Sequence, residues 1–148
     1  MHNQNKWQHR FRGHICRWTA PRQAIVDLLS RTKKHLSAKD IYTELVKIYP
    51  GLGLTTVYRT LDLLARSGLI QTIAIGDGQN RYELRAGNKS DHHHHLICTN
   101  CGKIVDYREF MEEELEFIHK AEKKLEAKFS FKILDHNIEF IGLCKNCQ

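Results

Sequence analysis

Apolar residues in the first half of the chain recur three and four positions apart, which is the spacing of amphipathic helices. One such stripe covers residues 25–29 and follows Thr-Ala-Pro at 19–21, a pattern typical of a helix start. A second stripe covers residues 41–49 and ends before a Pro-Gly pair. Ser37 stands three positions before Asp40 at the head of this stripe, and that spacing predicts a capping box.

A third helix is predicted by the apolar stripe of Val57, Leu61 and Leu64, which Gly68 is expected to end in a left-handed conformation. The opposite face offers short hydroxyl groups, one aromatic ring and one guanidinium. Such groups can reach phosphates and base edges. The residues that we place on this face are Thr55, Thr56, Tyr58, Arg59 and Thr60.

The pattern then changes to that of strands. LIQTIAI at 69–75 and NRYEL at 80–84 flank Gly-Asp-Gly at 76–78, which predicts a β-hairpin. Three helices followed by a hairpin is the order of a winged helix-turn-helix. Many domains of that kind bind DNA, and others bind proteins.

The second half has a different order of elements. HLIC at 95–98 and KIVDY at 103–107 predict paired strands, residues 110–127 predict an amphipathic helix, and residues 129–144 predict one or two further strands. The expected order is therefore β-β-α-β-β. Small polar residues at 86–90 separate the halves. We predict an α+β protein with a first domain at 1–85, a hinge at 86–90 and a second domain at 91–148.

The charge of the chain differs between these halves. Residues 1–85 carry 14 Lys and Arg against 6 Asp and Glu, whereas residues 86–148 carry 9 against 11. A basic first half favours a polyanionic partner, although a solvated basic surface is the plainer alternative. No apolar run reaches the length of about 20 residues that a membrane span needs, and the N-terminus lacks an apolar signal core. We therefore expect a cytoplasmic protein with no membrane partner.

Four of the five cysteines form two Cys-x-x-Cys pairs, Cys98 with Cys101 and Cys144 with Cys147. Zinc prefers four tetrahedral thiolates, and a Cys-x-x-Cys turn can point two thiolates at one ion. In a chain without an export signal this pattern favours metal over disulfides. Because four thiolates leave no open position for a substrate, we expect a structural Zn²⁺. Two disulfides or free thiols are the alternatives.

Four consecutive histidines, 92–95, precede the first cysteine pair. In an extended segment, alternate side chains face opposite sides. His93 and His95 would then share one face, and His92 and His94 the other, which is the arrangement that two separate metal sites need. A solvated low-complexity patch is the alternative.

These motifs occur together in an order that resembles the ferric uptake regulator (Fur) superfamily. The resemblance covers roughly residue 17 to the end of the chain. The residues that carry it are Thr19–Arg22, Thr56–Leu61, Gly68–Ile70, His93 with His95, both Cys-x-x-Cys pairs and Asp135–His136.

The resemblance implies a winged helix-turn-helix domain that binds DNA, followed by a small α/β dimerisation domain with a structural zinc site. By resemblance, Tyr58 and Arg59 would contact the major groove, and Arg17 would reach the minor groove. The candidate DNA-binding residues are Arg17, Arg22, Thr55, Thr56, Tyr58 and Arg59.

The same resemblance implies two further sets of metal ligands. The regulatory set is His35, Glu83, His93, His95 and Asp106. Imidazoles with carboxylates suit Fe²⁺, Mn²⁺ or Zn²⁺. On position alone, His35 also fits a surface histidine in a loop. The additional set is His92, His94, Glu113 and His136. Relatives often carry Asp at the place of His94, which makes this set softer than usual.

We therefore predict a metal-responsive transcriptional regulator, in the first place an iron-responsive repressor, that binds palindromic operators as a homodimer. Glu83 favours iron, because peroxide-sensing relatives typically have Asp there and zinc-sensing relatives often add a Cys. Zinc, manganese or peroxide sensing are alternatives within the family. A zinc-stabilised protein-interaction module or a metal-dependent hydrolase are alternatives of another class. We expect no enzyme, since no HExxH-like catalytic arrangement is present.

Overall fold

The contacts of the chain divide it into two units, Met1–Arg85 and Ala86–Gln148, which we call the N-terminal and C-terminal units. The computed structural model describes residues 18–76, 78–85 and 93–148. The expected hinge at 86–90 lies outside these residues, as do Cys16, Arg17 and His92. Within the described ranges, no helix has both the length and the apolar character that crossing a bilayer requires.

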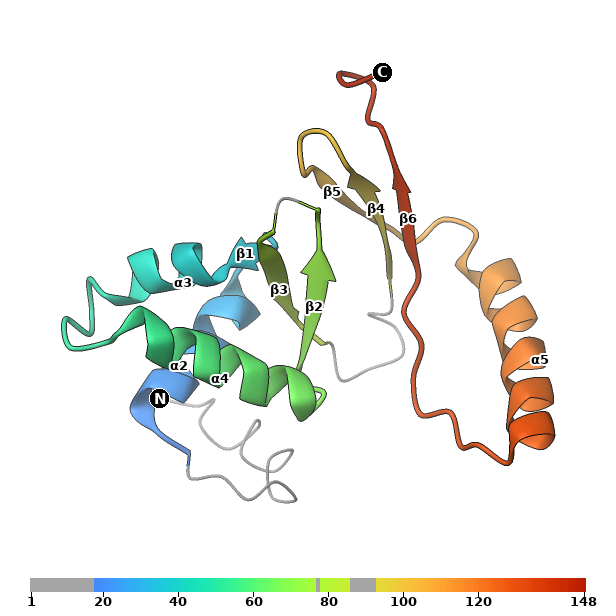
Figure 1. Ribbon diagram of the computed structural model, residues 1–148, viewed down its shortest axis with the longest axis horizontal. Coiled ribbons are helices and arrows are strands. Elements are labelled where there is room, and N and C mark those ends of the chain that lie inside the picture. The colour runs from blue at the N-terminus through green and yellow to red at the C-terminus, as the bar shows by residue number, and fades with distance from the viewer. Residues whose placement is uncertain (1–17, 77, 86–92) are drawn as a thin grey trace. The chain divides into compact units, whose positions relative to one another are not determined.

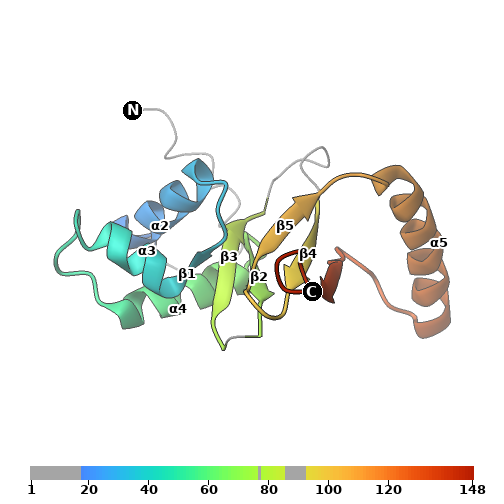
Figure 2. The same ribbon diagram turned by 90° about the horizontal axis from the view of Figure 1, so that it is seen from above.

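The N-terminal unit contains three helices and a three-stranded antiparallel sheet of order β1-β3-β2. In both views the helices gather on one side of strands β2 and β3 (Figures 1 and 2). The two-residue strand β1 was not predicted, because its residues read as the entry to a helix. The elements are α2 (Ala20–Arg31), β1 (Leu36–Ser37), α3 (Ala38–Leu45), α4 (Leu54–Arg66), β2 (Ile70–Ala74) and β3 (Asn80–Leu84).

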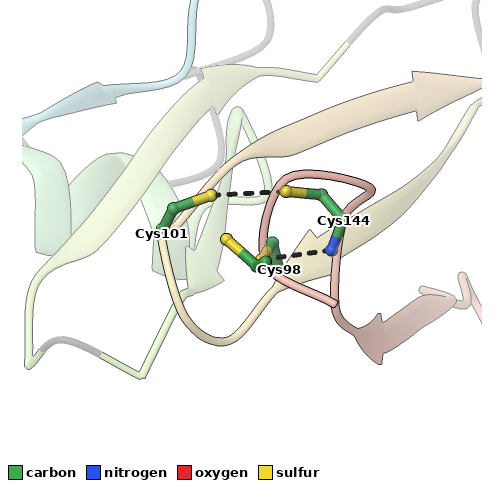
Figure 3. Close-up of side chains that lie close together, drawn as sticks. Cys98, Cys101 and Cys144 are labelled. Carbon is green, nitrogen blue, oxygen red and sulfur yellow. Dashed lines mark hydrogen bonds between the residues drawn. The ribbon is translucent and has the colours of Figure 1, made fainter.

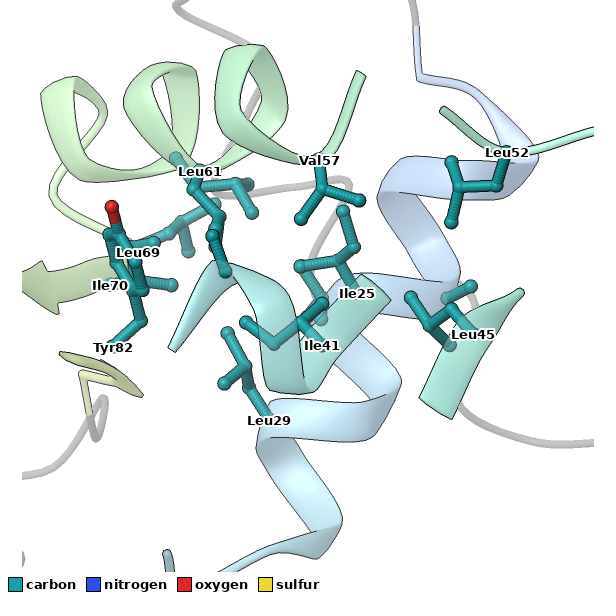
Figure 4. Packing of buried hydrophobic residues seen from close by; sticks show 14 residues of the cluster. Ile25, Leu29, Ile41, Leu45, Leu52, Val57, Leu61, Leu69, Ile70 and Tyr82 are labelled. Atoms are coloured by element: carbon teal, nitrogen blue, oxygen red, sulfur yellow. The ribbon is translucent and has the colours of Figure 1, made fainter. Parts of the chain in front are cut away.

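The hydrophobic core of this unit joins one face of each helix to the sheet (Figure 4). Ile25 of α2, Ile41 of α3 and Leu61 of α4 are fully buried within it. Thr60 is also buried, with 3% of its surface exposed, so the prediction that it lies on the outer face of α4 is wrong. The reason is its position three residues after Val57, which places it on the apolar stripe.

The ends of the helices follow the local sequence. Ser37 accepts a hydrogen bond from the Asp40 amide at 3.1 Å, and the Asp40 carboxylate accepts one from the Ser37 amide at 2.9 Å, which confirms the capping box. Gly68 has φ +71° and follows α4, as predicted. Its amide and that of Leu69 donate to carbonyls of the last turn, which satisfies groups that a helix end otherwise leaves open.

The C-terminal unit contains a three-stranded sheet of order β5-β4-β6 and one long helix. The sheet is mixed, because β4 pairs with β5 antiparallel and with β6 parallel. The elements are β4 (His94–Cys98), β5 (Ile104–Tyr107), α5 (Met111–Phe129) and β6 (Glu139–Gly142). Residues 129–144 thus form one strand and no second one. Left-handed residues flank the helix, Phe110 with φ 64° and Ser130 with φ 51°.

Candidate functional site

The four paired cysteines lie together where the last turn of the chain meets the turn between β4 and β5. Cys98 ends β4, Cys101 lies in the following turn, and Cys144 and Cys147 follow β6. Their sulfur atoms all lie within 4.8 Å of one another. The Cys144 amide donates to the Cys98 sulfur at 3.3 Å, and the Thr99 amide donates to the Gly142 carbonyl at 2.9 Å (Figure 3). The parallel pairing of β4 with β6 therefore brings the two Cys-x-x-Cys turns together.

The spacing of the sulfur atoms fits zinc better than disulfides. The Sγ atoms of Cys101 and Cys144 are 3.7 Å apart, well beyond a disulfide bond of about 2.05 Å. Zinc–sulfur bonds of about 2.3 Å in a tetrahedron place two sulfurs about 3.8 Å apart. The four described cysteines are all free thiols. The two-disulfide alternative therefore does not describe this structure.

The charge state of the thiols also suits a cation. Hydrogen bonds from the backbone of Cys101 and Cys144 lower the pKa of Cys98 to about 6, so its thiolate is accessible near neutral pH. The pKa of Cys147 is raised to about 12. A hydrogen bond with Asn100 acts to lower it, but the neighbouring Cys144 and burial outweigh that effect. Several thiolates in so small a volume repel one another, and a divalent cation removes that repulsion.

The N-terminal unit holds two residues of the predicted regulatory set. His35 directly precedes β1, and Glu83 lies in β3, which pairs with β1. The strand register sets the two residues opposite each other, and the His35 Nε2 atom lies 3.0 Å from the Glu83 Oε2 atom. This contact shows that His35 is not simply a histidine of an exposed loop.

The C-terminal unit holds the other three residues of that set. His95 in β4 lies opposite Asp106 in β5, and its Nε2 atom is 3.6 Å from the Asp106 Oδ1 atom. The rings of His93 and His95 meet edge to face with centroids 5.0 Å apart. The ligand atoms of these three residues lie within 4.8 Å of one another. Two imidazoles and one carboxylate therefore converge at one end of β4.

The additional set is arranged differently from the expectation. His94 is buried, and its Nδ1 atom lies 2.9 Å from the Glu114 Oε2 atom, whereas Glu113 is exposed. His136 contacts Glu122 at 3.0 Å, and its ring centroid is 6.0 Å from that of His94. Burial lowers the pKa of His94, so its imidazole is biased towards the neutral form. The sequence could not select Glu114, because three consecutive glutamates begin α5.

Helix α4 presents the predicted DNA-facing residues to solvent. Thr55, Thr56, Tyr58 and Arg59 are exposed, and 46% of the Tyr58 surface is accessible. The α4 amide groups of the first turn have no side-chain cap. Arg22 is partly buried in α2. Short hydroxyls, a tyrosine and an arginine on one helix face form a surface that can hydrogen-bond to phosphates and base edges.

The comparison with known families decides the class of this protein. A model of the ferric uptake regulator family matches residues 14–141. The chain belongs to this family. The ferric uptake regulation protein of Bacillus subtilis (strain 168) is 40% identical to it over 131 residues, which are 88% of this chain and 84% of that protein.

Solved structures of the Fur family agree with the fold. The ferric uptake regulator from Francisella tularensis, solved with iron, is 30% identical with a TM-score of 0.65, over 90% of this chain and 96% of that one. The ferric uptake regulator from Pseudomonas aeruginosa, solved with manganese, is 25% identical with a TM-score of 0.69, over 93% and 97%. The predicted α+β class is confirmed by these matches.

Fur family proteins are transcriptional regulators that bind DNA as dimers, and they are not enzymes. The predicted class of metal-binding transcriptional regulator is therefore confirmed for this chain.

Proposed function

We propose that this protein is an iron-responsive repressor that binds a palindromic operator in double-stranded DNA as a homodimer. The observation that carries the proposal is that each unit holds imidazole and carboxylate donors in numbers too small to fill the coordination shell of a metal. His35 and Glu83 form one partial set, and His93, His95 and Asp106 form the other.

The two partial sets act as ligands of one regulatory ion. Only residues 85–92 separate the end of β3 from His93, so one short connection links both sets. Two or three imidazoles with carboxylates form a donor set that accepts Fe²⁺, Mn²⁺ or Zn²⁺. Iron is favoured because the 40% identical relative is a ferric uptake regulation protein and a 30% identical relative was solved with iron.

The four thiols hold a second, structural ion. A zinc ion supplies four bonds that tie the end of the chain to the turn after β4. The sulfur spacing of 3.7 Å and the low pKa of Cys98 support this role. A site that all four thiolates close offers no position for a substrate, so it stabilises the unit and does no chemistry.

The C-terminal unit forms the dimer. Its sheet and helix expose large apolar side chains, and contiguous apolar surface of that kind marks protein interfaces. A two-fold dimer places two copies of α4 at a fixed separation, which matches two half-sites of a palindrome about one helical turn apart. The exposed large apolar residues of this unit include Phe110, Phe117, Phe131, Leu134, Phe140 and Ile141.

The regulatory ligands work as a switch by differential affinity. When His35 and Glu83 share an ion with His93, His95 and Asp106, the orientation of the two units is restricted, and a dimer with both α4 helices in register becomes more populated. An ion shifts this equilibrium only by as much as it binds the restricted state more tightly. Without shared ligands, fewer molecules are competent to bind the operator.

The test is DNA binding titrated with Fe²⁺, Mn²⁺ and Zn²⁺ under buffered, anaerobic conditions. The probe is a duplex that the wild-type protein selects from a random pool at saturating metal. His93→Ala is expected to lose at least about tenfold in affinity at intermediate Fe²⁺, because one ligand of the switch is gone. His119→Ala, an exposed histidine of α5, is the matched control and is expected to bind like wild type.

Two results would contradict the proposal. Equal affinity of His93→Ala and wild type at every metal concentration would refute the switch. A failure of wild type to select any duplex, or binding that does not weaken with salt, would refute DNA binding itself, since each phosphate contact contributes about −0.9 to the log–log salt slope. A response to Mn²⁺ or Zn²⁺ at lower free concentrations than are present in cells would replace iron as the signal.

A further inference from the structure

The hydrophobic core of the N-terminal unit contains one buried side chain with a polar end. Of the 14 residues in this cluster, Tyr82 alone carries a polar side-chain atom, and only 7% of its surface is exposed. In Figure 4 its hydroxyl oxygen lies at the end of the ring that is nearer to α4. A phenylalanine would bury the same apolar area, so packing alone does not require the hydroxyl group.

The backbone of Tyr82 is fixed on both sides. It lies in β3, the central strand of the sheet, and pairs with Leu36 of β1 and with Thr72 of β2. Its strand neighbour Glu83 points to the opposite face of the sheet, whereas Asn80 shares the face of Tyr82. The ring is therefore held by a rigid frame rather than by a loop.

The surroundings of the hydroxyl link it to the exposed face of α4. Burial raises the pKa of Tyr82, and a hydrogen bond with the Asn80 side chain opposes this shift. The negative charges of Tyr58 and Asp62 raise the pKa further, so both groups lie near enough for their charge to act on the hydroxyl. Tyr58 and Asp62 are four residues apart and therefore lie on one side of α4.

Asp62 adds a reason for that side of α4 to be ordered. Its Oδ2 atom lies 2.9 Å from the Arg66 Nη2 atom, so one negative charge on the DNA-facing helix is partly compensated. A carboxylate beside a surface that meets phosphates needs such compensation. Tyr58, Asp62 and the Tyr82 hydroxyl thus form one polar group at the junction of helix and sheet.

We propose that Tyr82 is a positioning residue for DNA reading: its buried hydroxyl, held by the central strand, fixes the side of α4 that carries Tyr58. The proposal rests on the proposed function, because it takes α4 as the element that reads DNA. Tyr58 would make the base contact, and Tyr82 would act only through it. The effect is therefore on discrimination between sequences more than on binding to phosphates.

The test compares Tyr82→Phe with wild type on two probes at saturating Mn²⁺, which does not oxidise in air as Fe²⁺ does. One probe is a duplex selected from a random pool by wild type, and the other is its scrambled version. Tyr82→Phe is expected to lose about three- to tenfold in preference for the selected duplex, with salt slope and melting temperature unchanged. The control is Tyr42→Phe, a tyrosine of α3 half-buried against the same core.

A double-mutant cycle distinguishes positioning from a general loss of stability. With Tyr58→Ala already present, Tyr82→Phe is expected to change the preference no further, because the side chain to be positioned is gone. An unchanged preference for Tyr82→Phe, an equal loss for Tyr42→Phe, or an additive loss in the cycle would each overturn the inference. Arg59→Ala separates the two proposals: if Arg59→Ala loses binding and Tyr82→Phe keeps its preference, only this inference fails.

Discussion

The two units of this chain are stabilised in different ways. The N-terminal unit has a continuous apolar core in which Ile25, Ile41 and Leu61 are fully buried. In the C-terminal unit no residue of α5 is buried, and Phe117 exposes 73% of its surface. The first unit thus meets the ordinary requirement of a globular domain, whereas the second presents its apolar residues to solvent.

This difference shows how each unit obtains its stability. Burial of large aliphatic side chains accounts for the first unit. A small unit that cannot bury enough apolar surface needs a staple, such as a metal site, or a partner that covers its apolar face. The C-terminal unit has both features, four gathered thiols and an exposed apolar surface, so a metal ion and a second copy complete it.

Removal of the thiol site is expected to have the largest effect. Cys144→Ser should unfold the C-terminal unit, because structural zinc contributes about 10–16 kcal/mol in small fingers and whole domains are stable by only about 5–15 kcal/mol. The N-terminal unit should keep its own cooperative transition. Hydrogen exchange resolved along the full chain measures both, with β4 and β6 losing protection while α4 retains it.

Cys16→Ser is the control, since this cysteine belongs to neither pair. Retained protection of β4 in zinc-free Cys144→Ser protein would show that the sheet does not depend on the thiol site. The comparison between the two units would then have to rest on the dimer alone.

Equal truncations in the two units are expected to give opposite outcomes. Leu61→Ala should lower the free energy of unfolding of the N-terminal unit by about 2–5 kcal/mol, because it leaves a cavity in a fully packed site. Ile141→Ala, at a side chain 68% exposed, should change the stability of the monomer by less than about 0.5 kcal/mol. It should instead weaken dimerisation by about tenfold or more.

Denaturant unfolding at low concentration and sedimentation across a concentration series measure these two quantities. Lys145→Ala, near the end of the same chain segment, serves as a surface control for self-association. A loss of dimer stability for Leu61→Ala alone would reverse the roles that we give to the two units.

The smallest effect is expected at the capping box. Ser37→Ala should cost about 1 kcal/mol in the free energy of unfolding of the N-terminal unit. The side-chain and backbone hydrogen bonds of Ser37 lower the pKa of Asp40. A lowered pKa stabilises the fold above the unfolded value of about 4 and loses that contribution as pH falls through the folded value. The difference between wild type and Ser37→Ala should therefore shrink below pH 4.

Urea unfolding at pH 7 and at pH 3 measures this dependence. Ser30→Ala removes an exposed serine whose hydroxyl donates to the Asp27 carbonyl, and it should change stability by less than about 0.5 kcal/mol. A difference between wild type and Ser37→Ala that stays constant with pH would show that the Asp40 carboxylate does not take part.

Local signals made much of the N-terminal unit predictable. Ser37 and Asp40 fix a helix start through bonds three residues apart, and Gly68 ends α4 because a left-handed residue is needed there. Such features depend on the chain within one turn of itself. Thr60 shows the limit of this reasoning, since its hydroxyl suggested an outer position while its spacing from Val57 placed it inside.

The C-terminal unit was less predictable, because its arrangement depends on pairing between distant segments. The parallel pairing of β6 with β4 has no signature in either strand alone. The contact of His94 with Glu114 rather than Glu113 depends on the rotation of α5 about its axis, which three consecutive glutamates do not reveal. The sequence could nevertheless select the four cysteines, since Cys-x-x-Cys fixes the spacing of two ligands within one turn.

The parallel pairing of β4 with β6 also orders events during synthesis. The strands of the β1-β3-β2 sheet have all been made once residue 84 has left the ribosome. The β5-β4-β6 sheet needs residues 139–142, close to the last residue of the chain. Because chains emerge from the N-terminus and domains fold as units, the DNA-reading unit can take its final form before translation ends. The thiol site can close only at termination, so a truncated product keeps the basic helical unit and lacks the means to pair it.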